Sequence, residues 1–305
     1  MKRLFVIIVT YKGQRWYDRC FGSLRQSTIP IQTIVVDNAS NDGTVEYIKE
    51  HFPEIHLVES KENLGFGRAN NIAMRHALDN GCDYAFLLNQ DAWIEPNTLQ
   101  QLVNIAERHP DYGIVGPVQV NAERTKVLSG MIRFLVNPDN LNLDLFSDLM
   151  IGSVDEIYPV AEINAAAWLL PRKTLEIVGG FDPIFLHYGE DWNYLSRVLY
   201  HKMKVGLTPR IQVVHDCVEH VDRPKSYSME FDKWLLQRAA DIQYPDTQVE
   251  DMMRHYGRMA LVKLVAFHKA TFKENWGAYK FLMKHKTVIE QSRNQNKKKT
   301  NSWLE

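Results

Sequence analysis

The sequence lacks the features that mark several classes of protein. Among 305 residues there are three cysteines, Cys20, Cys82 and Cys217, which are too few and too scattered for a disulfide framework or a CxxC metal site. Their scarcity favours a reducing compartment. No apolar stretch approaches the roughly 20 residues that span a bilayer. The apolar run after Arg3 reaches Thr10 without a small-residue cleavage site. We therefore expect a cytoplasmic protein, soluble or peripheral at the inner face of a membrane.

A net charge of one sign is also lacking, as are several catalytic signatures. The formal net charge is -1, so the whole chain is not a polyanion binder. With no RNP-like motif either, we expect no nucleic-acid partner. There is no GxGxxG after the first predicted strand, no Walker A pattern, no GxSxG and no HExxH. Hydrophobic residues make up 45% and charged residues 24%, which is typical of a globular chain with a sizeable core.

The first half of the chain alternates apolar strand-like runs with helix-like segments. Continuous apolar strands separated by helices predict an α/β fold with a mainly parallel sheet covered on both faces. In such a sheet a ligand binds beyond the carboxyl ends of the strands. The predicted strands are 4–9, 32–36, 55–59, 84–88 and 113–118, and the predicted helices are 16–26, 44–51, 67–80 and 96–108.

The second half of the chain is less regular. Residues 121–160 have few periodic apolar segments, which predicts a loop-rich insert. Further helices are predicted at 173–178 and 192–200, short strands at 205–208 and 211–214, and helices again from about residue 226.

The C-terminal part is basic. Residues 252–305 hold 12 Lys and Arg against 3 Asp and Glu, a balance of +9 in a chain whose total is -1. Two interpretations stay open: contact with an anionic membrane surface, or a solvated helical face. The lysine-rich end, residues 293–305, predicts a flexible tail.

Polar clusters follow three of the predicted strands, and in a parallel sheet they lie at one edge. Asp91, in the third cluster, has two interpretations. It can hold Mg²⁺ or Mn²⁺, which favour oxygen ligands and often use one or two carboxylates plus phosphates. Alternatively, it caps the next helix or forms an Asx-turn. The clusters are Thr10-Tyr11, Asp37-Asn38 and Asn89-Gln90-Asp91.

Asp37 is equally open. A carboxylate at this point can accept the ring N–H of a pyrimidine base, with Thr10 and Tyr11 beside the base and ribose. However, residues 37–43 are dense in turn formers, so Asp37 can also serve the turn alone. Residues 63–71 pose a similar choice: their glycines and Arg68 can lie near a diphosphate at a helix N-terminus, or they form a turn with a solvated arginine.

Two further positions can carry chemistry. Glu190 and Asp191 precede a predicted helix, where the helix dipole stabilises a carboxylate, so capping alone would explain Asp191. Alternatively, one acid orients a substrate and the other removes a proton, which requires reach within roughly 3 Å or through one water. His215 ends an apolar strand; imidazole is a common manganese ligand, although a lone histidine is more often structural.

Taken together, the segments resemble a known family, the family 2 glycosyltransferases of the GT-A fold, and within it the rhamnosyltransferase-like bacterial branch. The resemblance covers about residues 3–220. The segments that carry it, in order, are VIIVTYKG, IVVDNASNDGT, ENLGFGRANNIA, FLLNQDAWI, AAAWLLPR, VGGFDPIFLHYGEDWNYLSRV and VVH.

The resemblance implies an activity. A sugar would pass with inversion from a nucleotide-diphosphate sugar, a dTDP- or UDP-sugar, to a hydroxyl of a glycan or polyprenyl-linked acceptor in bacterial cell-surface polysaccharide synthesis, with Mn²⁺ or Mg²⁺ as cofactor. It also implies a catalytic domain over residues 1–225, with a nucleotide-sugar half at about 1–120 and an acceptor half at about 121–225. A helical basic extension follows over residues 226–292.

The resemblance also assigns roles to residues. Asp191 corresponds to the catalytic base of the ED motif and Glu190 to its partner, while Asp91 and His215 correspond to metal ligands. The donor-binding positions are Thr10, Tyr11, Asp37, Asn38, Arg68, Asn71, Asn89 and Gln90, and the sugar or acceptor positions are Trp168 and Tyr188.

Two residues depart from the family pattern. Asn89 replaces the first acid of the DxD metal motif, and Asn193 stands where a second acid usually follows the ED pair. These departures leave metal affinity open, and they keep a catalytically impaired nucleotide-sugar-binding module as an alternative. A nucleotidyltransferase would share the alternating start, but residues 10–15 match its glycine-rich signature poorly.

Overall fold

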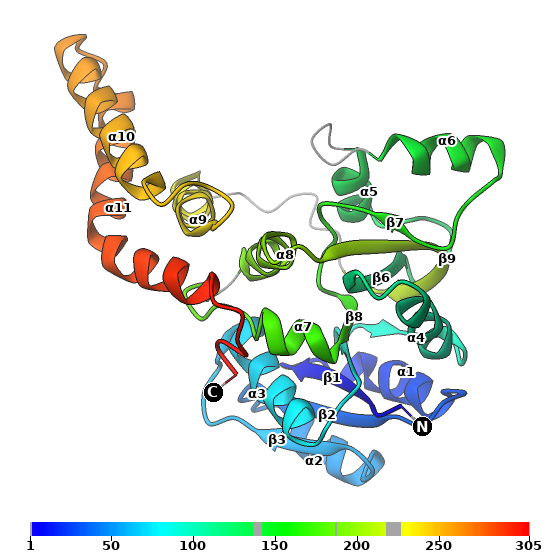
Figure 1. Ribbon diagram of the computed structural model, residues 1–305. Helices are drawn as coiled ribbons and strands as arrows, with labels where there is room; N and C mark the ends of the chain where they lie inside the picture. Colours follow the sequence, from blue (N-terminus) through cyan, green and yellow to red (C-terminus); the bar gives the residue numbers. More distant parts are fainter. Residues whose placement is uncertain (1, 137–141, 187, 218–226, 305) are drawn as a thin grey trace.

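The computed structural model describes residues 2–136, 142–186, 188–217 and 227–304. Figure 1 shows a central sheet with helices on both faces and, to one side, a pair of C-terminal helices that projects away from it. The mixed, mainly parallel α/β fold with a helical C-terminal part is as the sequence predicts. No helix in the described ranges combines the length and apolar composition needed to cross a bilayer.

One half of the sheet is parallel. Strands β1 (Leu4–Thr10), β2 (Gln32–Asp37), β3 (His56–Glu59) and β4 (Tyr84–Leu88) lie in the order β3-β2-β1-β4. They are joined through α1 (Gln14–Arg25), α2 (Thr44–His51) and α3 (Gly65–Asp79). Parallel neighbours require such crossover helices, so all four strands present their carboxyl ends at the same edge.

The other half of the sheet is mixed. Strand β8 (Ala167–Pro171) runs antiparallel between β4 and β6 (Tyr112–Val120). Strand β9 (Lys204–His215) is parallel to β6 and also pairs with β5 (Ala92–Trp93) and β7 (Tyr158–Pro159). The two short strands predicted at 205–208 and 211–214 are thus one strand, and β8 was not predicted.

Two apolar layers hold the sheet between its helices. Along β1, Phe5 and Ile7 face one layer while Val6 and Ile8 face the other, as the two-residue period of a strand requires. The first layer is closed by α3, α7 (Arg172–Ile177) and α8 (Glu190–Tyr200), and the second by α1, α2 and α4 (Thr98–Arg108). Each large apolar side chain buried in them stabilises the fold by roughly 1.5–3 kcal/mol.

The insert at 121–160 is more regular than predicted. It contains α5 (Ser129–Val136) and α6 (Leu143–Ile151), and residues 137–141 lie outside the described ranges. Met131 and Leu145 anchor these helices in the first apolar layer. The segment therefore holds two helices that were not predicted, because their buried positions are too widely spaced to produce a visible helical period.

The C-terminal part forms helices α9 (Tyr227–Ala240), α10 (Gln248–Val265) and α11 (Lys269–Asn296). They share a small apolar core with Phe185 from the body, in which Leu235, Val249 and Leu282 are buried. The boundary predicted near residue 225 falls outside the described residues.

The prediction of a flexible tail at 293–305 is wrong for the described residues. Arg293 is 2% exposed, and its guanidinium donates to the carbonyl oxygens of Tyr244 (2.8 Å) and Pro245 (2.7 Å). The carbonyl of Ser302 accepts from the backbone N–H of Gly180 (2.8 Å). Leu304 is 1% exposed, inside the first apolar layer. The lysine run concealed these anchors because its charges are the part that faces solvent.

Leu304→Ala should therefore destabilise the whole fold. Removing a fully buried leucine side chain costs about 2–5 kcal/mol. Urea unfolding followed by fluorescence should show this loss in the free energy of unfolding. The matched control is Lys299→Ala, which changes an exposed residue of the same segment and should stay within about 0.5 kcal/mol of the wild type. Small and equal changes in the free energy of unfolding for both variants would instead support the prediction of a flexible tail.

Candidate functional site

Two adjoining cavities lie at the carboxyl edge of the parallel strands. The larger, of about 540 Å³, is bordered by the start of α8 and the end of β9, and the smaller, of about 260 Å³, by the ends of β1 and β4. Phe66 and Asn89 line both and form their common wall. The larger cavity is lined by Phe66, Asn89, Asn164, Ala165, Ala166, Tyr188, Glu190, Asp191, His215 and Lys233. The smaller is lined by Val9, Tyr11, Asn38, Asn63, Gly65, Phe66, Asn89, Gln90 and Asp91.

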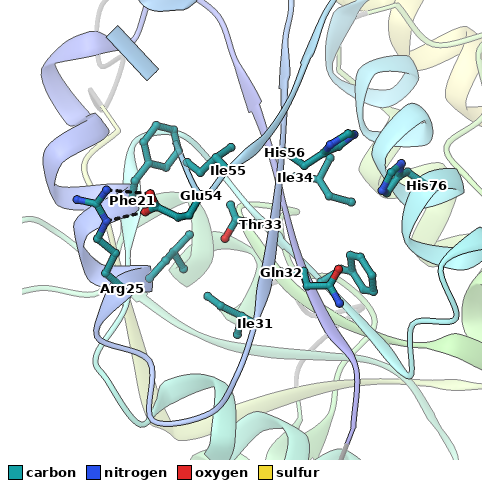
Figure 2. A pocket seen from close by; sticks show the side chains of 12 residues that line it. Phe21, Arg25, Ile31, Gln32, Thr33, Ile34, Glu54, Ile55, His56 and His76 are labelled. Carbon is teal, nitrogen blue, oxygen red and sulfur yellow. Dashed lines mark hydrogen bonds and ion pairs between the residues drawn. The ribbon is translucent and has the colours of Figure 1, made fainter. Parts of the chain in front are cut away.

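A third cavity lies at the opposite, amino-terminal edge of β1 and β2. Figure 2 shows it with the Arg25–Glu54 ion pair (2.6 Å) on one side and the stacked rings of His56 and His76 on the other. It holds about 250 Å³ and contains none of the residues that the sequence singled out. Because α/β sheets bind ligands at the carboxyl ends of their strands, we place the site in the other two cavities.

Asp91 and His215 meet at the common border of these cavities. The pairing of β5 with β9 sets Ala92 opposite His215, and the backbone N–H of Asp216 donates to the carbonyl of Asp91 (2.8 Å). The Asp91 Oδ1 atom consequently lies 3.3 Å from His215 Nε2. Two side chains that are far apart in the sequence are thus adjacent, and their role as metal ligands stays a prediction.

Gln119, which the sequence did not single out, orients His215. The carbonyl of Asn164 can only accept, so Gln119 Nε2 donates to it (3.3 Å). That leaves Gln119 Oε1 to accept from His215 Nδ1 (3.1 Å). In the neutral ring the proton then resides on Nδ1, and the lone pair of Nε2 points towards Asp91. Gln119 lies near the carboxyl end of β6, which was the available signal.

The pair fits a divalent cation. Two ligands at right angles around an ion at roughly 2.1 Å are about 3.0 Å apart, close to the 3.3 Å between Asp91 Oδ1 and His215 Nε2. A carboxylate and a neutral imidazole are suitable ligands for manganese. No cluster of three His, Cys, Asp or Glu side chains occurs among the described residues, so a cation here would take its remaining ligands from a phosphate or water.

The two acids of α8 begin that helix and line the larger cavity. Asp191 Oδ1 accepts from the backbone N–H of Trp192 (2.8 Å), so part of its carboxylate does serve the helix start. Its pKa is raised because burial disfavours the charged form. Burial likewise raises the pKa of Glu190 to about 7.

Two buried acceptors at this cavity lack a partner within the described part of the chain. They are Glu190 Oε2 and Asn164 Oδ1, and both residues line the larger cavity. Leaving such an atom unpaired costs about 1–3 kcal/mol. A ligand that carries hydroxyl groups would satisfy both atoms, so their position favours a sugar or another polyol here.

Gly67 lets α3 approach this region closely. A Cβ at this position would stand 2.9 Å from Phe181 Cβ and 3.7 Å from Glu190 Cβ. The glycine that the sequence placed near a diphosphate thus serves the packing of α3 against the segment before Glu190.

Thr10 and Asp37 are more deeply buried than a base contact requires. Asp37 is 1% exposed, and its carboxylate accepts from Thr10 Oγ1 (3.0 Å) and from the backbone N–H of Ser40 (2.8 Å). Neither residue lines either cavity. The contacts present are those of the turn interpretation, and a role at a base stays a prediction.

The neighbouring positions do reach the smaller cavity. Asn38 Oδ1 accepts from the N–H of Leu64 (2.7 Å) and its Nδ2 donates to Asn63 (2.9 Å), which fixes the glycine-rich loop. Gln90 Oε1 accepts from the N–H of Tyr11 (2.9 Å), while Gln90 Nε2 donates to the carbonyl of Tyr11 (3.1 Å). These pairs hold the rim of the cavity in place.

Like Thr10 and Asp37, three more residues assigned from the resemblance line neither cavity. Arg68 is exposed and donates to the carbonyl of Pro183 (3.1 Å). The amide of Asn71 holds the backbone of Phe181 through bonds of 2.8 and 2.7 Å. Trp168 is fully buried and stacks on Phe181 at 6.3 Å. The strand alternation of β8 directs Trp168 into the core, and its neighbours Ala165 and Ala166 line the larger cavity instead.

Lys233 lines the larger cavity and was not singled out in the sequence. It comes from α9, and its ammonium group lies 4.6 Å from the ring centroid of Tyr188. Tyr188 also lines the larger cavity, and its role at a sugar or acceptor stays a prediction. Lys233 is the single Lys or Arg among the described residues that line the two cavities. It is therefore a candidate for the positive charge that the sequence assigned to Arg68.

The sequence is similar to those of known glycosyltransferases. The family model described as "Glycosyl transferase family 2" matches residues 5–153. The chain is 26% identical over 231 residues to the N-acetylglucosaminyl-diphospho-decaprenol L-rhamnosyltransferase of Mycobacterium tuberculosis. This match covers 69% of the chain and 75% of the relative. It is 21% identical over 220 residues to the dTDP-rhamnosyl transferase RfbF of Shigella flexneri, covering 70% and 68%.

Solved structures show the same fold. Staphylococcus aureus TarS 1-349 in complex with UDP-GlcNAc has a TM-score of 0.57 at 14% identity, over 97% of this chain and 90% of that one. The mannosyltransferase PcManGT from Pyrobaculum calidifontis, in complex with GDP-Man and Mn²⁺, has a TM-score of 0.53 at 19% identity, over 96% and 73%.

The fold is GT-A-like, as in these solved neighbours, and the family match gives the class of the protein as a nucleotide-sugar glycosyltransferase. The chain carries a glycosyl transferase family 2 domain at residues 5–153, and its distant homologues include proteins named rhamnosyltransferases.

Proposed function

We propose that the protein transfers a sugar with inversion from a nucleotide-diphosphate sugar to a hydroxyl of a glycan or polyprenyl-linked acceptor. One observation carries the proposal: Asp191 and His215 line one cavity, and Asp91, 3.3 Å from His215, lines the cavity adjoining it. A candidate cation-binding pair and a candidate proton acceptor therefore border two adjoining cavities that share Phe66 and Asn89 in their lining. In the proposed mode of binding, one donor molecule extends across both cavities.

In this arrangement the nucleotide lies in the smaller cavity, and the sugar and acceptor lie in the larger one. Asp91 and His215 would hold a divalent cation, which when bound neutralises charge on the diphosphate. Lys233 lines the larger cavity and would add positive charge there. Glu190 Oε2 and Asn164 Oδ1, unpaired within the described residues, would accept hydrogen bonds from sugar hydroxyls.

Asp191 would act as the general base. It removes the proton from the acceptor hydroxyl, whose oxygen then attacks the anomeric carbon on the face opposite to the diphosphate. The raised pKa of Asp191 makes the carboxylate a stronger base than an exposed aspartate. Holding both substrates in one space supplies a further part of the rate enhancement.

For the donor we propose a dTDP- or UDP-sugar. Two relatives are named as an L-rhamnosyltransferase and a dTDP-rhamnosyl transferase, and a solved neighbour holds UDP-GlcNAc. A thermal-shift panel of dTDP-, UDP- and GDP-sugars, each with Mn²⁺ or Mg²⁺, tests this choice. We expect the unfolding midpoint to rise only with a dTDP- or UDP-sugar and more with a metal than without. A response to none of them would contradict the proposal.

The alternative is a catalytically impaired nucleotide-sugar-binding module. Asn89 in the metal motif and Asn193 after the acid pair favour it. Both functions predict donor binding, so they differ in turnover. Metal-stimulated release of free sugar from the bound donor by wild-type protein would support the enzyme, and tight binding without any release would support the module.

Gln119→Leu should weaken metal binding although Gln119 does not touch the metal. Loss of an outer hydrogen bond to a ligating histidine typically costs 10- to 100-fold in metal affinity. We therefore expect a drop of about that size in Mn²⁺ affinity, measured by calorimetry with a nucleoside diphosphate present. In the control, Gln119→Glu, an acceptor for His215 Nδ1 is retained and much of the affinity should return. Unchanged affinity in Gln119→Leu would show that His215 is not a ligand.

Lys233→Met and Arg68→Met test which cation binds the donor: Lys233, which lines the larger cavity, or Arg68, which the resemblance assigns. A hydrogen bond to a charged group contributes about 1.5–3 kcal/mol. Loss of the Lys233 ammonium should therefore weaken diphosphate-sugar binding roughly 10- to 100-fold. Arg68 lines neither cavity, so its variant should bind within about twofold of the wild type. Fluorescence titration with the donor compares them, and the reverse ranking would contradict this site.

A further inference from the structure

The pair of helices α10 and α11 projects from the body of the protein. Figure 1 shows the two side by side, with the turn between them at the end farthest from the sheet. The end nearer the body packs into a core, through Val249 of α10 and Leu282 and Ile289 of α11. We call residues 254–284 the hairpin. Nothing in the catalytic proposal requires a long outward helical pair.

The tip of the hairpin exposes large apolar side chains. Leu261 is 64% exposed, Val265 78% and Phe267 89%. Phe267 has a left-handed backbone with φ of 56° because it closes the C-terminus of α10, where the N–H of His268 donates to the carbonyl of Lys263 (3.0 Å). Exposure of this size in a cluster marks an interaction surface rather than chance.

One side of the hairpin combines these apolar groups with aromatic rings and cations. On α10, Arg258, Leu261 and Val265 recur three and four residues apart, so they share one side. On α11, stacked rings continue that side: Trp276 lies 5.3 Å from Tyr279. A groove of about 530 Å³ between the helices is lined by Leu261, Arg258, Trp276 and Tyr279 among others.

The charge of the hairpin decides between possible partners. Residues 254–284 contain seven Lys and Arg and one acid, Glu274. A second copy of the hairpin would bring like charges together, which opposes self-association. An anionic surface would match them. Tryptophan, tyrosine and cations around an apolar tip are the composition of segments that lie in the interface of a bilayer.

We propose that the hairpin docks on an anionic phospholipid bilayer, with Val265 and Phe267 entering the headgroup region and the surrounding lysines and arginines contacting lipid phosphates. The inference does not depend on the proposed sugar transfer. It assigns the excess positive charge of the C-terminal part to a defined surface, the hairpin.

Sedimentation of the full chain with phosphatidylcholine vesicles, with or without phosphatidylglycerol, tests the proposal. We expect binding to the anionic vesicles, weakened by salt, and little binding to neutral ones. The double variant Val265→Ser with Phe267→Ser should bind anionic vesicles about tenfold or more weakly. Val288→Ser is the matched control, because Val288 is 52% exposed on α11 but points to a different side of that helix.

Three results would overturn the proposal. These are wild-type protein that ignores anionic vesicles, a double variant that binds as the wild type does, and a Val288 variant that is impaired equally. Analytical ultracentrifugation without vesicles adds a fourth: a wild-type oligomer that the double variant abolishes would assign the surface to a second copy. Donor binding by each variant confirms that its body is intact, so failure of this proposal is distinguishable from failure of the catalytic one.

Discussion

Asp191→Asn should reduce turnover by about 10²- to 10⁴-fold, the range that a positioned general base contributes. The asparagine carbonyl can still accept from the N–H of Trp192, the bond that Asp191 Oδ1 makes at 2.8 Å. The fold and donor affinity should therefore remain nearly unchanged. Turnover at saturating donor and acceptor, together with donor affinity by calorimetry, gives both quantities. Turnover within a factor of two of the wild type would remove Asp191 from the mechanism.

The pH dependence of turnover provides the control for this variant. A general base works only when ionised, and burial raises the pKa of Asp191. Turnover of the wild type should therefore fall as pH decreases through that raised pKa. Residual turnover of the Asn variant should lack this acid limb. If the limb persists unchanged, another group is the base, and Glu190, with a pKa of about 7, is the next to test.

Asp91→Ala should abolish the metal dependence of donor binding. The substitution removes one of the two side chains that face the cation position, since Asp91 Oδ1 and His215 Nε2 lie 3.3 Å apart. Because the alanine offers the cation no charged ligand, affinity for a nucleoside diphosphate in the presence of Mn²⁺ should fall roughly 10- to 150-fold. Calorimetry with Mn²⁺ and with a chelator measures it, and we expect wild type and variant to be alike only under chelator.

A neighbouring acid provides the matched control for Asp91. Asp216 follows His215 directly, yet its carboxylate accepts from Trp16 Nε1 (3.0 Å) and lines neither cavity. Asp216→Asn should therefore retain the metal effect. Loss of the metal effect in Asp216→Asn but not in Asp91→Ala would contradict the site.

The parallel half of the sheet was predictable from sequence for a physical reason. Strands buried on both faces are continuous apolar runs, and each here ends abruptly in polar residues. Parallel strands bring those ends together, so the convergence of residues near Tyr11, Asn38 and Asp91 followed without coordinates. The segment containing Glu190 and Asp191 was also visible, because a helix start leaves its acids at the surface of a cavity.

Other parts of the site depend on antiparallel pairing and were hidden. Strand β8 is five residues long, and its position between β4 and β6 follows from contacts far apart in the sequence. That position decides that Trp168 enters the core and that Asn164 supplies a carbonyl to Gln119. Lys233 was hidden for a different reason: the C-terminal part has many cations, and only tertiary packing of α9 selects one lysine for the cavity.

Asn89, which replaces the first acid of the metal motif, still lies beside the proposed cation site. Asn89 still lines both cavities, and its amide nitrogen lies 3.4 Å from His215 Nε2. Its backbone N–H donates to the carbonyl of Ala166 (2.9 Å). Asn89 thus lies beside Asp91 and His215 as a neutral polar wall, and in the proposed site Asp91 and His215 would supply the carboxylate and nitrogen ligands.

All of this depends on Asp91, His215 and Asp191 acting around one bound diphosphate-sugar. The most direct measurement is crystallography of the protein with Mn²⁺ and a dTDP- or UDP-sugar, with data collected at the manganese absorption edge. We predict one anomalous peak between Asp91 Oδ1 and His215 Nε2, in contact with the diphosphate, and a sugar whose anomeric carbon faces Asp191. A bound diphosphate with its manganese elsewhere, or a sugar that points away from Asp191, would contradict the account.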